Sequence, residues 1–334
     1  MSSDRELTID IHAHVVVPEV VDLVQDEFDP ARDPFLRYGG ASTAYNERLT
    51  GELTPMLTNP TRRLERMDRQ GVLCQAVSIA PPQYHYWAGP ELGARIALVQ
   101  NDAIAELVDL YPDRLIGLGT LPMQAPTEAV AELERVTTQH GFRGVAINPS
   151  AEGVDYDDPV YEPFWARIED LEVLVVLHPN GFSDGARLTR YYLINVVGNP
   201  LETTVAVSRL ILSGVLERHP GLKILAVHGG GYLPFYMDRM DHAYEARTDV
   251  SGLIPEKPST YLKSLYFDSV VFGRGLADLI DLVGPEHVLM GTDYPFDMGE
   301  PDPVGRIHSV PGLSGDDRGK ILGRTAARLL GLPP

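Results

Sequence analysis

Short apolar runs alternate with longer stretches of helical pattern along most of the chain. Several runs are apolar at consecutive positions, which is typical of parallel strands covered by helices. Eight runs have the length and composition of β-strands, at 7–11 (LTIDI), 72–80 (VLCQAVSIA), 114–121 (RLIGLGTL), 144–148 (GVAIN), 173–177 (VLVVL), 223–227 (KILAV), 264–270 (SLYFDSV) and 287–291 (HVLMG).

Amphipathic stretches separate these runs. The clearest lie at residues 61–71, 91–112, 125–141 and 202–221. Glycine ends the last two shortly after their final apolar position, as is common at helix C-termini. Eight alternations of strand and helix predict an α/β fold, the (β/α)8 TIM barrel. An open doubly wound sheet is the main alternative, but no Gly-X-Gly-X-X-Gly loop follows the first run to support it.

The first connection of the predicted barrel is unusually long. About 45 residues separate the first strand from the helix at 61–71, whereas loops in compact domains have a median of about 4 to 6 residues. We therefore expect one barrel domain over residues 1–334, with a small insertion at about 15–60 beside the barrel mouth. We expect the insertion to carry short strands of its own.

Composition narrows the class of partner. The chain has 334 residues, of which 44% are hydrophobic, and a formal charge of -19. Such acidity opposes binding to nucleic acid or to an anionic membrane, so the expected partner is a small molecule or another subunit. A single cysteine, Cys74, excludes an intramolecular disulfide. The charged opening MSSDRELTIDIHAH does not resemble a secretory signal, and no run reaches the roughly 20 apolar residues of a membrane span, so we expect a cytoplasmic location.

Potential metal ligands follow four of the eight predicted strands. The first strand leads into His12 and His14 in TIDIHAH, the fifth ends at His178 in VVLHP, the sixth is followed by His228 in LAVHGGG, and the eighth by Asp293 in MGTDYP. Each residue alone has an ordinary structural explanation; Asp293, for example, could cap a turn. The C-terminal ends of barrel strands form the active-site mouth, so the coincidence of all five at that end favours a metal site.

Three imidazoles and one carboxylate are a donor set typical of zinc, although manganese or iron would also fit. We therefore expect one divalent transition metal, with zinc favoured. His228 lies beside three glycines that allow backbone and substrate to approach closely. It could be a further ligand, but we favour a general base, because a metal lowers the pKa of bound water to about 7, within reach of a histidine.

The motifs TIDIHAH, VLHP, AVHGGG and MGTDYPF resemble the amidohydrolase superfamily. The closest likeness is to the branch of 2-amino-3-carboxymuconate-6-semialdehyde decarboxylases, which is grouped with metal-dependent phenolic-acid decarboxylases. The likeness extends to YWAGPE (86–91), LIGLGTLPMQAP (115–126), NPLETTVAVSRLILSGVLERHPGLKI (199–224) and GTDYPFDMGE (291–300), and it is weak between residues 17 and 61.

The resemblance implies roles for individual residues. It implies that His12, His14, His178 and Asp293 hold the metal and that His228 is the general acid/base. It also implies a homodimer, in which Arg247 reaches the neighbouring active site to bind a substrate carboxylate, and a pocket lined by Phe296.

Two departures from the family pattern concern the substrate. The stretch GELTPMLTNP lacks the carboxylate-binding arginine that the family carries there; Arg48 is the nearest upstream, and Arg62 and Arg63 have the pattern of helix-surface residues. Asn180 stands where the family has a pocket tryptophan. Since an arginine clamp and an aromatic wall are specific devices, their loss predicts a different substrate.

These features together predict a metal-dependent, nonoxidative decarboxylase of a small unsaturated or aromatic carboxylic acid. Either His228 or Asp293 could deliver the proton to carbon. The main alternative is a hydrolase or hydratase of a lactone, an amide or a ring-cleavage product on the same site. A noncatalytic metal-binding protein is a weaker alternative. His85 and Trp87 follow the second strand at the end where they would contact the substrate, unless they serve only in packing.

Overall fold

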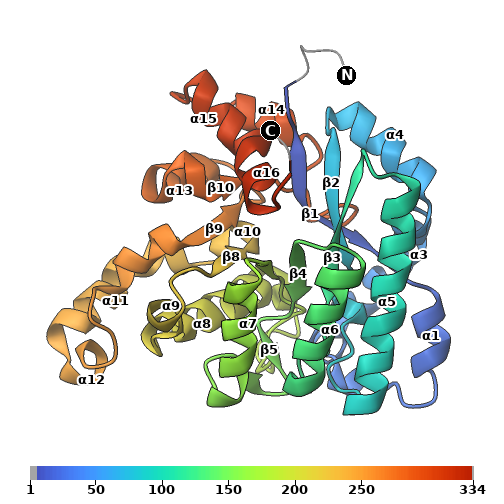
Figure 1. Cartoon of the computed structure of the whole chain (residues 1–334), viewed down its shortest axis with the longest axis horizontal. Helices are drawn as coiled ribbons and strands as arrows, with labels where there is room; N and C mark the ends of the chain where they lie inside the picture. Colours follow the sequence, from blue (N-terminus) through green and yellow to red (C-terminus); the bar gives the residue numbers. More distant parts are fainter. Residues whose placement is uncertain (1–5, 333–334) are drawn as a thin grey trace.

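Eight parallel strands form a barrel in the computed structural model, which describes residues 6–332 (Figure 1). Each strand pairs with its neighbours in chain order. Their bounds are β1 Ile9–Val15, β2 Cys74–Ile79, β3 Leu115–Thr120, β4 Gly144–Ile147, β7 Leu174–Leu177, β8 Lys223–Ala226, β9 Leu265–Asp268 and β10 Val288–Leu289. All eight lie within or overlap the predicted runs, so the barrel prediction is confirmed; β1 differs by continuing through both histidines.

The last strand closes the barrel against the first. The backbone N–H of Ile11 donates to the carbonyl of Met290 at 2.9 Å, and that of His14 donates to the carbonyl of Tyr294 at 2.8 Å. Ala13 and Tyr294 form a parallel bridge. The segment that carries Asp293 is thereby held beside the histidines of β1.

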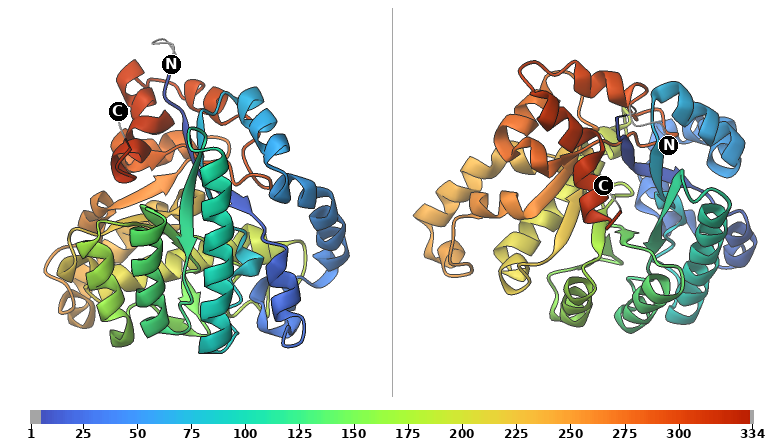
Figure 2. Two further views of the ribbon diagram at one scale, coloured as in Figure 1. Left: turned by 45° about the vertical axis from the view of Figure 1, so that its right-hand side comes forward. Right: turned by 45° about the horizontal axis from the view of Figure 1, so that its top comes forward.

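Helices surround the strands (Figure 2). They are α4 Pro60–Gln70, α5 Pro90–Leu110, α6 Pro126–Gln139, α7 Glu162–Asp170, α8 Asn199–Leu212, α9 Val215–Arg218, α10 Val227–Gly230, α11 Leu233–Ala246, α12 Thr248–Ser251, α13 Gly275–Val283, α14 Pro303–His308, α15 Gly315–Gly319 and α16 Thr325–Leu329. Shorter elements are η3 Pro81–Gln83, η4 Pro159–Tyr161, η6 Pro258–Ser264 and η7 Pro285–His287, the π-helices η5 Ile194–Gly198 and η8 Lys320–Arg324, and a hairpin of β5 Ser150–Ala151 and β6 Val154–Asp155.

The first connection contains helices, so our expectation of short strands within it was wrong. Between β1 and α4 lie α1 Glu19–Val24, η1 Pro30–Arg32, α2 Pro34–Arg37, η2 Gly40–Ser42 and α3 Thr43–Thr58. Val20 and Val24 are buried one helical turn apart, as are Leu53 and Leu57. This spacing of four places each pair on one helical face, whereas a strand would need a spacing of two.

Alternation along β7 shows how a strand directs His178, a predicted ligand, toward the barrel mouth. Leu174 and Val176 pack in a core cluster with residues of α16, while Val175 and Leu177 pack in the other cluster, with α7 and α8. Side chains of a strand alternate between its two faces, so His178, the next residue, continues the series of Leu174 and Val176.

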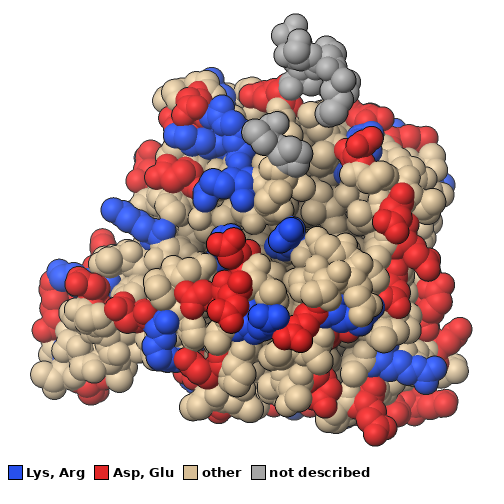
Figure 3. Space-filling model, viewed as in Figure 1, with Lys and Arg blue, Asp and Glu red and all other residues tan. Residues whose placement is uncertain are grey.

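Acidic side chains are spread over most of the face drawn in Figure 3, with basic ones in smaller groups between them. This distribution accords with the formal charge of -19. Within residues 6–332, no helix combines the length and the hydropathy required to cross a bilayer.

Candidate metal centre

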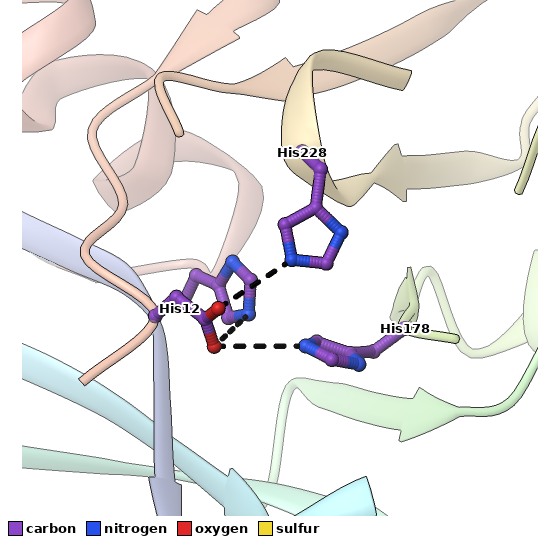
Figure 4. A group of neighbouring side chains, drawn as sticks. His12, His178 and His228 are labelled. Atoms are coloured by element: carbon purple, nitrogen blue, oxygen red, sulfur yellow. Dashed lines mark ion pairs between the residues drawn. The ribbon is translucent and has the colours of Figure 1, made fainter. Parts of the chain in front are cut away.

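Four imidazoles and one carboxylate converge at the C-terminal end of the barrel. Nε2 of His14 lies 3.1 Å from Nε2 of His12 and 3.1 Å from Oδ1 of Asp293. The distances from the Asp293 carboxylate are 3.3 Å to His12 Nε2, 3.8 Å to His178 Nε2 and 3.6 Å to His228 Nε2. Figure 4 shows the labelled imidazoles approaching this carboxylate from separate elements. The five residues predicted from the strand ends are therefore brought together.

The donor atoms fit a bound cation. One donor from each of His12, His178, His228 and Asp293 lies within 4.8 Å of the others. Nε2 of His178 is buried and has no hydrogen-bond partner in the described chain, while its Nδ1 contacts the carbonyl of Pro179 at 2.9 Å. Since an unsatisfied buried nitrogen is costly, and since two Nε2 atoms face each other at 3.1 Å in His12 and His14, a shared metal ion suits this set.

Asp268 orients His12. Its Oδ2 lies 2.6 Å from Nδ1 of His12, and its Oδ1 accepts the backbone N–H groups of Gly229 at 2.9 Å and Val270 at 3.2 Å. A carboxylate on Nδ1 fixes the imidazole tautomer and leaves Nε2 available as a ligand. Ser78 makes the corresponding contact with His14, at 3.2 Å between Oγ and Nδ1.

A second buried carboxylate, Asp10, ties β1 to the segment of Asp293. It accepts the backbone N–H groups of His12 at 3.1 Å and Thr292 at 3.0 Å, the hydroxyl of Thr292 at 2.6 Å and the side-chain amide of Gln75 at 2.7 Å. Burial raises the pKa of Asp10 to about 6 against these hydrogen bonds. The network holds the histidines and Asp293 in a common frame.

Arg63 is buried, with 1% exposure, so our expectation that it lies on the helix surface was wrong. It shares the inward face of α4 with Met67, one turn away. Its guanidinium donates to the carbonyl of His14 and, at 2.6 Å, to Oε1 of Gln75, and it lies 4.8 Å from the ring centroid of Tyr294. Arg62, in contrast, is exposed as expected.

The backbone is locally unusual at two of the converging residues. His228 has φ of +54° and Asp293 has φ of +58°, values that side chains other than glycine rarely adopt. Gly229, directly after His228, has φ of +61°, and a Cβ there would lie 2.2 Å from Val271. Strained conformations of this kind cluster at functional sites.

The electrostatics of the cluster favour a cation. Burial opposes the charged form of His12, yet the carboxylates of Asp293 and Asp268 raise its pKa to about 10. Burial also works against the charge of Asp293, but the adjacent imidazoles hold its pKa well below its usual range. For His178, burial dominates and lowers the pKa well below its ordinary value, which keeps the ring neutral and able to ligate.

Four of the predicted substrate-binding residues lie near this centre or beside it. The ring of Phe296 lies 5.4 Å from that of His14. Asn180, His85 and Trp87 line a neighbouring cavity of about 220 Å³. The Asn180 amide donates to Asp33 at 2.8 Å, and the rings of His85 and Trp87 lie 5.5 Å apart.

The structure places Arg247 elsewhere. It follows α11, is exposed, and pairs with Asp249 at 2.6 Å. Helices α11 and α12 extend to the left of the barrel in Figure 1. Within one chain, Arg247 is therefore no part of the converging cluster.

Sequence reasoning missed several residues around the cluster. Asp268 ends the seventh barrel strand, so the strand-end argument could have found it. Asp10 precedes His12 by two, the spacing of a strand face. Tyr192 carried no signal: its φ is +59°, and burial with the charges of Asp297 and Asp293 raises its pKa.

Comparison with known proteins places this site in a family. The amidohydrolase family model matches residues 9–332. A 2-amino-3-carboxymuconate-6-semialdehyde decarboxylase from Dictyostelium discoideum is 33% identical, over 99% of this chain and 93% of that protein.

Two solved structures of decarboxylases are similar across nearly the whole chain. The crystal structure of 5-carboxyvanillate decarboxylase from Sphingomonas paucimobilis is 29% identical, with a TM-score of 0.87 over 98% of this chain and 100% of that chain. A dihydroxybenzoic acid decarboxylase from Polaromonas sp., with bound manganese and the inhibitor 2-nitroresorcinol, is 26% identical, with a TM-score of 0.82 over 98% and 97% of the two chains.

Proposed function

Because the chain belongs to the amidohydrolase family, we propose that it is a metal-dependent, nonoxidative decarboxylase of a small aromatic or unsaturated carboxylic acid. The observation that carries this proposal is the convergence of His12, His14, His178 and Asp293, with the unpartnered Nε2 of His178 among them. The similar proteins named above, which are decarboxylases, support the choice of reaction.

These four residues would hold one divalent cation, with zinc favoured by the nitrogen-rich set. The manganese of the Polaromonas relative makes manganese the alternative, and metal analysis of the purified protein distinguishes the two. Loss of CO2 leaves an electron pair on carbon, and a divalent cation, when bound, supplies positive charge near that developing anion.

His228 is positioned to move the proton. Its side chain is 16% exposed, whereas those of His12, His14 and His178 are 1%, 0% and 6% exposed, so its ring is the imidazole most open to the mouth. Nε2 of His228 lies 3.6 Å from Asp293 Oδ2. We assign to His228 Nε2 the delivery of a proton to the carbon that loses CO2, with Asp293 orienting the ring.

The cavity of about 220 Å³ would take the rest of the substrate. Asn180, which follows His178 by two residues in the chain, lines it. Tyr84 and Trp87 line it, and their hydroxyl and indole N–H are buried without hydrogen-bond partners in the described chain. These donors suit a ring with oxygen substituents, while the buried carboxylate of Glu202 on the same wall opposes a second carboxylate. A hydroxylated aromatic acid that places no second carboxylate against this wall fits best.

The first test is a coupled assay for CO2 release with the metal-loaded protein. Hydroxybenzoates and carboxymuconates serve as substrates, and Asp293→Ala serves as the control. Metal-dependent release of CO2 by the wild type alone is the expected result. Consumption of a substrate without CO2 release would instead support the hydrolase or hydratase alternative. A purified protein that neither contains nor takes up a divalent metal would overturn the proposal.

We further propose a homodimer in which Arg247 binds a substrate carboxylate in the partner's site. Its exposure and its distance from the cluster of its own chain are consistent with such a role. Mixing inactive Arg247→Ala and His228→Ala chains tests it, because the mixed dimer would contain one intact site. Recovery of roughly a quarter of wild-type activity is expected for random pairing. No recovery from dimers shown to exchange would contradict the shared site, and Asp249→Ala controls for the lost ion pair.

A further inference from the structure

A second cavity, of about 530 Å³, lies between α4 and the segment that follows Asp293. Its walls include Arg62, Arg66 and Arg69 on one side and Tyr294 and Phe296 on the other. Neither Asp293 nor any of the converging imidazoles lines it, although Phe296, whose ring lies 5.4 Å from that of His14, does.

The three arginines present one face of α4 to this cavity. Positions 62, 66 and 69 are one turn apart, and like charges at such spacing destabilise a helix. Among residues 6–332, no carboxylate oxygen lies within 4.0 Å of any of the three guanidinium groups. In contrast, Arg135 on α6 pairs with Glu132 at 2.7 Å. Arg62 and Arg69 are exposed, and the half-buried Arg66 donates to the carbonyl of Pro301 at 3.2 Å. Three cations without a carboxylate partner are unusual in a chain with a charge of -19.

Three carboxylates, Glu65, Asp297 and Glu300, also line the cavity, but none forms an ion pair with the three arginines. Glu300 accepts the backbone N–H of Asp302 at 2.8 Å. Burial raises the pKa of the Asp297 carboxyl, which weakens its negative charge in the cavity. Glu65 is exposed on α4. The cavity therefore keeps its cationic wall.

Tyr294, on the opposite wall, lies close to the arginines of α4. Burial raises the pKa of its phenol, and the opposing influences are four guanidinium charges, those of Arg63, Arg66, Arg69 and Arg62. Next to them, Gln70 donates to the carbonyl of Pro301 at 3.0 Å, while its buried Oε1 has no partner in the described chain. The site thus offers several cationic donors and one neutral acceptor.

We propose that this cavity is a second ligand site, which binds a small dianion of the phosphate or carboxylate class that also carries a hydroxyl group. Guanidinium groups bind the oxygens of both classes through paired N–H donors. The ligand hydroxyl would donate to Oε1 of Gln70. The proposal does not depend on the decarboxylase assignment, because the site shares no donor with the metal centre.

Calorimetric titration of the metal-loaded protein tests this site at constant ionic strength. Inorganic phosphate and malate are titrated separately, so that the tighter ligand identifies the class. We expect one saturable site per chain for at least one of them. The double variant Arg66→Ala, Arg69→Ala should bind at least about tenfold more weakly, because charge-assisted hydrogen bonds are lost.

The control is Arg274→Ala, which removes an exposed arginine that pairs with Asp278 and does not line the cavity, and it should leave binding unchanged. Arg69→Gln, at an exposed position of the cavity wall, serves as a second variant if the double variant is unstable. Absence of saturable binding of both anions, or binding that is unchanged in the arginine variants, would overturn the proposal.

Discussion

The metal centre and the 220 Å³ cavity beside it are built from different parts of the barrel. The converging donors stand on β1 or within four residues after β7, β8 and β10, and the buried carboxylates of Asp10 and Asp268 hold them. The cavity is walled by loops after β2, β4 and β7 and by the first connection. Its polar groups include Trp87 and Tyr84, which have no partners in the described chain.

This difference suggests that the metal centre determines the reaction and that the cavity determines the substrate. Donors fixed by strands and by buried hydrogen bonds give one geometry, which suits a cation that is common to a family. Loop residues can change without disturbing the barrel, so they determine which substrate is accepted. Substitutions in the centre should therefore change metal content and turnover, and substitutions in the cavity should change substrate affinity alone.

The largest effect is expected for the metal donors. His178→Ala and Asp293→Ala should lose the metal and reduce kcat by about 10³-fold or more, since the main charge-stabilising element is removed. Elemental analysis and the CO2 assay measure the two effects together. The exposed His308→Ala is the matched control. Full metal occupancy in both donor variants would show that these residues are not the ligands.

The next effect concerns His228. His228→Asn should retain the metal and reduce kcat by about 10²- to 10⁴-fold, the usual contribution of a general acid/base. Metal content distinguishes this role from that of a ligand. The distances alone do not, because a donor atom of His228 lies within 4.8 Å of those of His12, His178 and Asp293. Loss of the metal in His228→Asn would reassign the residue to the ligand set.

A smaller effect is expected for Asp268, the carboxylate that contacts Nδ1 of His12. Asp268→Asn keeps the shape of the side chain but weakens its interaction with His12 Nδ1, and it should reduce metal affinity by about 10- to 100-fold. Competition with a chelator measures this affinity. Ser78→Ala offers a graded comparison, because the contact of Ser78 with His14 is neutral and longer, at 3.2 Å. Equal affinity in Asp268→Asn and wild type would contradict the orienting role.

The smallest effect is expected in the cavity. Trp87→Phe removes the indole N–H and should raise KM roughly fivefold, corresponding to about 1 kcal/mol for one hydrogen bond, with metal content and kcat little changed. Leu110→Ala, an exposed apolar site distant from the mouth, is a suitable control. A fall in kcat with unchanged KM would place Trp87 in the chemistry and weaken the separation drawn above.

Local pattern accounts for the barrel and for its donors. Strands and helices differ in the period of their apolar positions, and this period is visible in any single segment. Once eight strands are recognised, His12, His178 and Asp293 must lie at the same end, because parallel strands share a direction. The positions of these residues thus followed from order along the chain.

Contacts between distant segments decided the rest. Arg63 has the sequence neighbours of a surface residue, and only the approach of β1 and β2 to α4 gives its guanidinium the carbonyl of His14 and the amide of Gln75. Asp268 meets His12 from 256 residues away. The first connection is helical because its helices bury one apolar face each, such as that of Val20 and Val24 in α1. Periodicity is local, whereas the pairing of buried polar groups depends on which segments the closed barrel brings together.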